Sequence, residues 1–227
     1  MIEPVAPNLK ARVLGWFWAV FLRLLCLTWR KKYVGFRAID AARSRGDKLM
    51  LCFWHGKYIP IMALCRWLWI ERRQENACVF TSLSARGAVI SEICRNFGLQ
   101  CILIPDGGHK HSYDLMRVAL AAHSAGVIAV DGPLGPHQKV KQGAVRLASE
   151  LGYRLVPAAV YANKKWIAGS RWDQMEFPWF FTRIGLSMGE PIEVLPKISR
   201  KEIRENMLLL SDSLQRLEVR AAQLTNS

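Results

Sequence analysis

A chain of 227 residues, 51% of them apolar, is long enough to bury a full hydrophobic core, so an intrinsically disordered protein is excluded. The formal net charge of +14 indicates an acidic partner, either nucleic acid or an anionic membrane surface. Nine tryptophans and nine phenylalanines favour the membrane, because tryptophan prefers the headgroup level, and no nucleic-acid-binding motif is recognisable. The six cysteines have no Cys-x-x-Cys or Cys/His metal spacing, so we expect a reducing compartment and no metal site.

The N-terminal region is predicted to form a membrane-associated amphipathic helix. Residues 13–29 are apolar and aromatic apart from a central Arg23, and this run is shorter than the roughly 20 apolar residues of a comfortable bilayer span. Cations on both flanks, at Lys10, Arg12 and 30–32, suit a helix that lies in the membrane interface. A buried core helix and a true span are the alternatives, and no signal-peptide cleavage pattern follows the run.

The rest of the chain alternates between strand and helix patterns. This alternation predicts an α/β fold with a mainly parallel mixed sheet flanked by helices. We expect the membrane-associated helix in residues 1–34, a single domain in 35–227, and an aromatic, basic surface loop near lipid in 165–184. The predicted strands are 49–54, 78–81, 100–104, 127–131 and 155–161, and the predicted helices are 38–45, 60–71, 88–97, 112–124, 141–151 and 199–224.

A histidine stands where the first core strand ends. His55 follows the apolar run 49–54 and precedes Gly56. At the rim of the sheet of an α/β protein, an imidazole is placed to take and return a proton near neutral pH. The alternative is a rim histidine that only hydrogen-bonds a loop.

A second signal begins at Asp131, at the end of the apolar run 127–130. A turn rich in glycine and proline follows at 132–136, and Lys139 and Lys141 stand where the next helix opens. Exposed backbone N–H groups and lysines beside a helix N-terminus suit a phosphate or a developing oxyanion. An ordinary turn with solvated lysines is the alternative.

Three stretches together resemble the bacterial lysophospholipid acyltransferase-like superfamily. They read FWHGKYIP, DGPLGPHQKVKQGAVRLASELGYRLVPAAVYA and RWDQMEFPWFFTRIGLSMGEPIEV, and the branch that they resemble most is catalogued as domain of unknown function 374. The resemblance runs in order over roughly residues 35–196. It implies a membrane-associated enzyme that moves an acyl chain from a thioester onto a lipid or glycolipid hydroxyl.

The resemblance also implies roles for the matching residues. His55 matches the histidine that acts as general base, and the block that starts at Asp131 matches the strand end that lines the acceptor site in relatives. On this basis the expected catalytic residues are His55 and Asp131, and the expected substrate-binding residues are Lys57, Gly132, Pro133, Gly135, Lys139 and Lys141.

Four places in the chain depart from the family pattern. The aspartate usual five residues after the histidine is Pro60, and residues 82–88 lack both acids of the usual Ser-x-Ser-x-Asp-Gly-Glu stretch. An arginine usual after the first Asp-Gly-Pro is Leu134, and the usual Arg-Gly-Ser segment is replaced by residues 105–110. A histidine base needs an acid to hold its tautomer, so Asp131 or Asp106 is expected to replace the missing one. His109 and Lys110 are candidates to hold a phosphate, with a plain exposed basic loop as the alternative.

The sequence thus predicts a fatty acyl transfer from acyl-CoA or acyl carrier protein to a lysophospholipid or glycolipid hydroxyl. No cofactor is expected, and the expected partners are anionic membrane lipids and acyl carrier protein rather than nucleic acid. The expected location is the cytoplasmic face of the bacterial inner membrane, with peripheral or monotopic attachment. The alternative is a catalytically silent relative that binds lipid or a membrane partner, and a nucleic-acid-binding protein fits only the charge.

Overall fold

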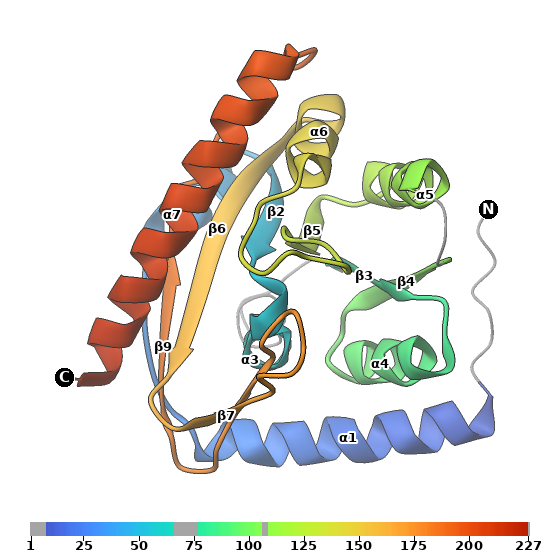
Figure 1. Cartoon of the computed structure of the whole chain (residues 1–227), viewed down its shortest axis with the longest axis vertical. Coiled ribbons are helices and arrows are strands. Elements are labelled where there is room, and N and C mark those ends of the chain that lie inside the picture. The colour runs from blue at the N-terminus through green and yellow to red at the C-terminus, as the bar shows by residue number, and fades with distance from the viewer. Residues whose placement is uncertain (1–7, 66–76, 106–108, 227) are drawn as a thin grey trace. The chain divides into compact units, whose positions relative to one another are not determined.

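The computed structural model describes residues 8–65, 77–105 and 109–226, and it has an α/β fold (Figure 1). Its strands are β1 (Arg30–Val34), β2 (Lys48–Phe53), β3 (Cys78–Ser82), β4 (Gln100–Ile104), β5 (Ala125–Ala129), β6 (Tyr153–Ala162), β7 (Lys165–Ile167), β8 (Glu176–Pro178) and β9 (Arg183–Met188). Its helices are α1 (Leu9–Thr28), α2 (Phe36–Ser44), α3 (Tyr58–Cys65), α4 (Ala85–Asn96), α5 (His109–Ala121), α6 (Gln142–Leu151) and α7 (Arg200–Asn226), with a 3-10 turn, η1 (His55–Lys57).

Seven strands form one mixed sheet in the order β1-β9-β6-β2-β5-β3-β4. Among the described strand pairs of this sheet, β1–β9, β2–β6, β3–β4 and β3–β5 are parallel and β6–β9 is antiparallel. Strands β7 and β8 form a separate antiparallel hairpin. The predicted fold class, a mainly parallel mixed sheet with helices and an apolar N-terminal helix, is therefore confirmed.

The chain divides into two compact units, the first made of residues 1–27 and 62–127 and the second of 28–61 and 128–227. The prediction placed one boundary, after residue 34, whereas the chain passes from one unit to the other three times, after residues 27, 61 and 127. The reason is the strand order. Most neighbouring strands of the sheet come from distant parts of the sequence, so each unit is built from two separate stretches of the chain.

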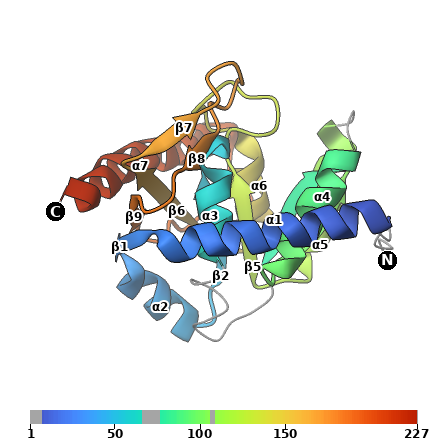
Figure 2. The same ribbon diagram turned by 90° about the horizontal axis from the view of Figure 1, so that it is seen from below.

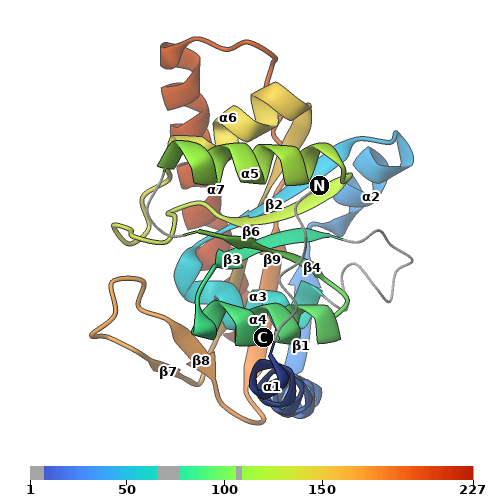
Figure 3. The ribbon, with the colours of Figure 1, turned by 90° about the vertical axis from the view of Figure 1, so that its right-hand side faces the viewer.

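In the first unit, α4 and α5 lie on opposite faces of β3 and β4 (Figure 3). Helix α4 begins where the side chain of Ser84 accepts a hydrogen bond from the backbone N–H of Gly87 at 3.0 Å, as a capping serine does. Helix α1 packs on α4 through small residues. A Cβ added at Gly15 would lie 2.2 Å from the Cβ of Glu92, so only glycine permits this approach.

Helix α1 is 20 residues long, and by length and composition it could cross a membrane. Its buried face is Ala11, Gly15, Ala19, Leu22 and Leu25, whereas most of its large apolar side chains are exposed. Arg23, the one charged residue in 13–29, is partly buried against the end of α4. Its guanidinium donates to the backbone carbonyl of Asn96, the last residue of α4 at the negative end of that helix, and lies 5.5 Å from the centre of the Phe97 ring.

In the second unit, β6 is buried along almost its whole length, and α7 runs alongside β6 and β9 (Figure 1). Helix α6 ends at Gly152, whose φ of 71° is the left-handed conformation that commonly stops a helix. Strand β1 is an edge strand with exposed cations, and it pairs in register with β9, Arg30 opposite Arg183.

Residues 165–184 contain more structure than the predicted surface loop. They hold β7, β8 and the start of β9. The loop between β7 and β8 lies beside the loop that follows β5 (Figure 2), and a Cβ added at Gly135 would lie 2.5 Å from the Trp172 ring. The predicted helix over 60–71 begins as α3, and its residues 66–71 lie outside the described residues.

Candidate active site

Strand β2 and the turn η1 place His55. Residues 49–53 of β2 are buried, and Trp54 keeps an extended backbone before the chain tightens into the 3-10 turn at His55. Gly56 lets the turn approach the β7–β8 loop, since an added Cβ would lie 2.2 Å from the carbonyl oxygen of Asp173. A residue with a side chain would therefore not fit at position 56, directly after the histidine.

The His55 ring is paired with an aspartate from that loop. Its Nδ1 lies 2.9 Å from Oδ2 of Asp173, whose side chain is fully buried, while the His55 side chain is 29% exposed. Arg171 clamps the same carboxylate, with Nε 2.9 Å from Oδ1 and Nη2 2.8 Å from Oδ2. Two hydrogen bonds from one guanidinium fix the plane of the carboxylate and thereby the direction in which it meets the imidazole.

The protonation state of this pair follows from its surroundings. Burial alone would raise the pKa of Asp173, but hydrogen bonds from Arg171 and His55 outweigh it and lower that pKa to about 2. An ionised carboxylate only accepts hydrogen bonds, so Nδ1 of His55 carries a proton. In the neutral ring the lone pair is then on Nε2, which makes no hydrogen bond within the described part of the chain. This is the tautomer that a general base needs.

Asp131 has a different role from the one predicted. Its Oδ1 accepts the backbone N–H of His55 at 2.8 Å, and its Oδ2 accepts the backbone N–H of Gln138 at 3.4 Å. The prediction that Asp131 orients the imidazole is therefore wrong. Both of its carboxylate oxygens accept hydrogen bonds from backbone N–H groups, and the ring is hydrogen-bonded to Asp173 instead. Burial raises the pKa of Asp131, and the hydrogen bond from the His55 backbone opposes that rise.

Aromatic side chains surround the imidazole. The ring centres of Trp172 and Tyr58 lie 5.2 Å and 5.7 Å from that of His55. The hydroxyl of Tyr58 donates to the sulfur of Met175 at 2.8 Å, which ties α3 to the β7–β8 loop. The imidazole thus stands beside aromatic, apolar surface.

Lys57 forms ion pairs with two glutamates. Its Nζ is 2.6 Å from Oε1 of Glu176 and 3.3 Å from Oε1 of Glu218, and the residue is 8% exposed. Lys165 shares Glu176 at 2.9 Å, and burial lowers the pKa of Lys165. A buried ammonium needs carboxylate partners, and that of Lys57 already has two, so substrate binding by Lys57 stays a prediction.

The glycine turn after β5 is present as predicted from its residues. Gly132 and Gly135 have φ of 71° and 66°, a region that favours glycine. Pro133, Lys139 and Lys141 are exposed, and the backbone N–H of Lys141 donates to the carbonyl of Val130 at 2.7 Å. The two lysines are therefore available to an anionic ligand.

The remaining candidates are less informative. Asp106 lies outside the described residues, and His109 and Lys110 begin α5 in the first unit, with Lys110 exposed. In residues 8–65, 77–105 and 109–226, no group of three or more His, Cys, Asp or Glu side chains could hold a metal ion.

Sequence reasoning missed Asp173 as the partner of the imidazole and did not consider Arg171. Trp172 and Asp173 stand in the stretch that begins RWDQMEFP, and the family resemblance assigns them no role. Their separation from His55 by 118 residues gives no local spacing that would connect them. The available signal was an aspartate with an arginine two residues before it, in a segment with few other acids.

Comparison with known proteins finds a similar protein over most of the chain but indicates no function. No protein-family model matches the chain. The chain is similar to "Uncharacterized protein RP090" of Rickettsia prowazekii (strain Madrid E), with 23% identity over 202 residues that cover 86% of this chain and 88% of the relative. The likeness therefore extends over nearly the whole of both proteins, and the relative's name states no activity.

Proposed function

We propose that this protein is a membrane-associated O-acyltransferase. It would move a fatty acyl chain from acyl-CoA or acyl carrier protein to a hydroxyl of a lysophospholipid or glycolipid at the cytoplasmic face of the bacterial inner membrane. The observation that carries the proposal is the His55–Asp173 pair, with 2.9 Å between Nδ1 and Oδ2 and a lone pair on Nε2 that no residue of the described ranges engages. It supplies the acid that the family pattern would place at Pro60.

The reaction follows from the tautomer. Nε2 of His55 takes the proton of the acceptor hydroxyl as its oxygen attacks the thioester carbonyl, and a tetrahedral oxyanion forms. The C–S bond then breaks, and the departing thiolate receives the proton from the imidazolium. The buried anion of Asp173 stabilises the imidazolium between these two steps.

The glycine turn supports the anionic parts of this reaction. The backbone N–H groups of Leu134 and Gly135 in this turn are the proposed donors to the oxyanion, and Lys139 and Lys141 are the proposed partners of an acceptor phosphate. The apolar surface at Trp172 and Tyr58 suits the acyl chain, because both rings lie beside the base.

The first test removes the base. His55→Ala should lower acyl transfer to lysophospholipid by about 10² to 10⁴, the usual contribution of general base catalysis, and should leave folding intact. His123→Ala is the matched control, since His123 hydrogen-bonds Ala119 and Gln100 and should keep normal turnover. Wild-type turnover in His55→Ala would refute the assignment of the base. A wild-type protein without turnover on any lysolipid would favour the silent lipid binder.

A further inference from the structure

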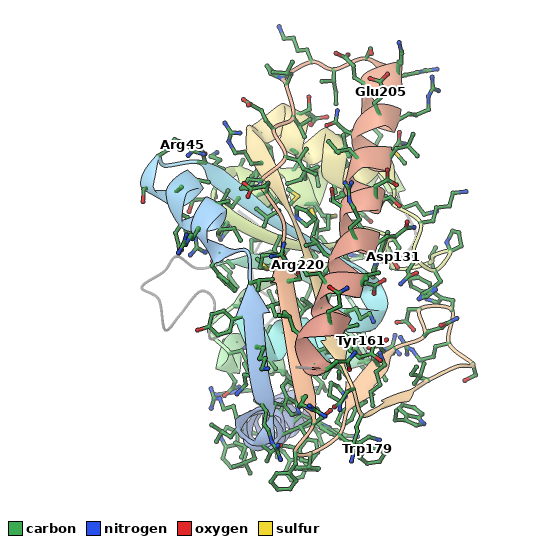
Figure 4. All side chains as sticks on the ribbon, turned by 90° about the vertical axis from the view of Figure 1, so that its left-hand side faces the viewer. Arg45, Asp131, Tyr161, Trp179, Glu205 and Arg220 are labelled. Carbon is green, nitrogen blue, oxygen red and sulfur yellow. The ribbon has the colours of Figure 1, made fainter. Side chains whose placement is uncertain are left out.

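Three consecutive aromatic residues at the turn between β8 and β9 stand out on the surface of the second unit. Trp179, Phe180 and Phe181 are 53%, 44% and 71% exposed. We call residues 179–181 the aromatic tip. Trp166 and Ile167 on β7, which pairs with β8, are also exposed, so the apolar surface continues along the hairpin. Figure 4 shows Trp179 near one end of the ribbon, well away from Asp131.

The backbone of the aromatic tip is held on two sides. The backbone N–H of Trp179 donates to the carbonyl of Lys164 at 3.0 Å, and its carbonyl accepts the indole N–H of Trp29 at 3.2 Å. The backbone N–H of Phe181 donates to the hydroxyl of Thr28 at 3.0 Å. A turn anchored in this way cannot fold its side chains back into the core without losing these bonds, so the aromatic rings are held outward.

The surroundings of the tip carry one sign of charge. Two acids occur in residues 28–35 and 163–183, Asp173 and Glu176, and both are buried in ion pairs with cations. The cations of the same stretches that are exposed, which we call the basic rim, are Arg30, Lys31, Lys32, Lys164 and Arg183.

We propose that the aromatic tip inserts into the headgroup region of an anionic phospholipid bilayer and that the basic rim binds the lipid phosphates around it. Exposed Trp and Phe beside Lys and Arg suit this region, because aromatic rings bury apolar surface there while the cations remain at the charged surface. The proposal does not require acyl transfer. It adds a contact by residues 179–181 to the attachment that we propose for α1.

The test uses the full chain and sedimentation with phosphatidylcholine vesicles, with and without phosphatidylglycerol. Trp179→Ser/Phe180→Ser should weaken binding to the anionic vesicles about tenfold or more, since two exposed rings are lost from the interface. Phe181 is left unchanged because its backbone is in the left-handed region, with φ of 56°, where a substitution could also alter the turn. The matched control is Leu208→Ser/Leu209→Ser, which removes two exposed apolar residues from α7 and should bind normally.

The basic rim is tested separately. Lys31→Gln/Lys32→Gln should weaken binding about tenfold or more on the anionic vesicles and little on the neutral ones, and salt should reduce the difference. Arg200→Gln/Lys201→Gln, at the exposed start of α7, is the charge-matched control.

A direct contact is measured with brominated lipids, which quench nearby indoles. Trp179→Phe should lose a part of the quenching seen in the wild type, and this conservative change keeps the turn folded. Unchanged quenching together with unchanged binding of Trp179→Ser/Phe180→Ser would overturn the proposal. It would also be overturned if that double variant changed the oligomeric state and not the vesicle binding, because the tip would then bind a second copy.

Discussion

At the scale of single residues, the site depends on which carboxylate meets which nitrogen of His55. Asp173 pairs with the ring, whereas Asp131 pairs with the backbone N–H of the same residue. The two aspartates should therefore give different phenotypes when each is replaced by asparagine, a change of nearly equal size.

Asp173→Asn should lower the rate of acyl transfer by about 10² to 10⁴, with the larger value expected if the imidazole takes the wrong tautomer. Asp131→Asn should mainly lower stability, because an amide cannot accept from both backbone donors and offers a donor of its own to one of them. Steady-state kinetics and thermal unfolding of the two variants separate these effects. Equal losses of turnover at equal stability would contradict the assigned roles.

Acid should expose the contribution of Asp173 to stability. Its pKa is about 2 in the folded protein, below the unfolded value of about 3.9, so ionisation favours the fold. This contribution is complete above the unfolded value and is lost as the pH falls toward about 2. We expect the wild type to exceed Asp173→Asn by up to about 2 kcal/mol at neutral pH and by about half as much near pH ~3, measured by denaturant unfolding.

At the scale of elements, strands with a continuous apolar run were predictable and short or edge strands were not. Strands β2 and β6 are buried over long runs, so pattern alone located them. Strand β1 reads Arg-Lys-Lys-Tyr-Val and was assigned to the flank of the helix, because only its pairing with β9 makes it a strand. Strands β7 and β8 have three residues each, too few to show a period. The segment that carries Asp173 therefore went unrecognised as structure.

Two glycines test how the loop after β5 supports the site. Gly135→Ala should destabilise the protein and slow acyl transfer, because φ is 66° and the new Cβ would press on the ring of Trp172, next to Asp173. Gly143→Ala, in the first turn of α6 with nothing within 4 Å of its added Cβ, should be neutral or stabilising by up to about 1 kcal/mol. Denaturant unfolding and turnover of the Gly135→Ala and Gly143→Ala proteins test this expectation. A neutral Gly135→Ala would mean that the loop is not held against Trp172.

The buried charges beside η1 give a further prediction at this scale. Lys57→Met should lower the free energy of unfolding by about 3 kcal/mol, since it leaves Glu218 and part of Glu176 without their cation. Lys201→Met is the control, because its pair with Glu205 is exposed and should matter by less than about 1 kcal/mol. The KM of the folded Lys57→Met protein should remain normal. A raised KM would support Lys57 as a substrate ligand.

At the scale of the whole molecule, the chain is basic and exposes many aromatic side chains. The sequence alone could predict only some of the surfaces on which these aromatic residues lie. Composition and the run 13–29 predicted an amphipathic helix, and α1 is a helix with exposed Trp16, Phe17 and Leu24. The sequence could not show that Gly15 and Ala19 form a closely packed seam or that Arg23 caps the end of α4. Those contacts depend on α4, which is distant in sequence, with Asn96 lying 73 residues after Arg23, and no local pattern encodes them.

Helix α1 therefore has two faces that should respond differently to substitution. Trp16→Ser/Leu24→Ser changes the exposed face, so folding should persist while binding to anionic vesicles falls, because apolar surface is lost from the interface. Gly15→Val changes the packed face and should destabilise the first unit strongly, because the new side chain would overlap Glu92. Thermal unfolding and vesicle sedimentation of both proteins provide the test. If Trp16→Ser/Leu24→Ser unfolds readily and still binds vesicles like the wild type, this face of α1 belongs to a protein contact, and the aromatic tip alone would remain as the proposed membrane anchor.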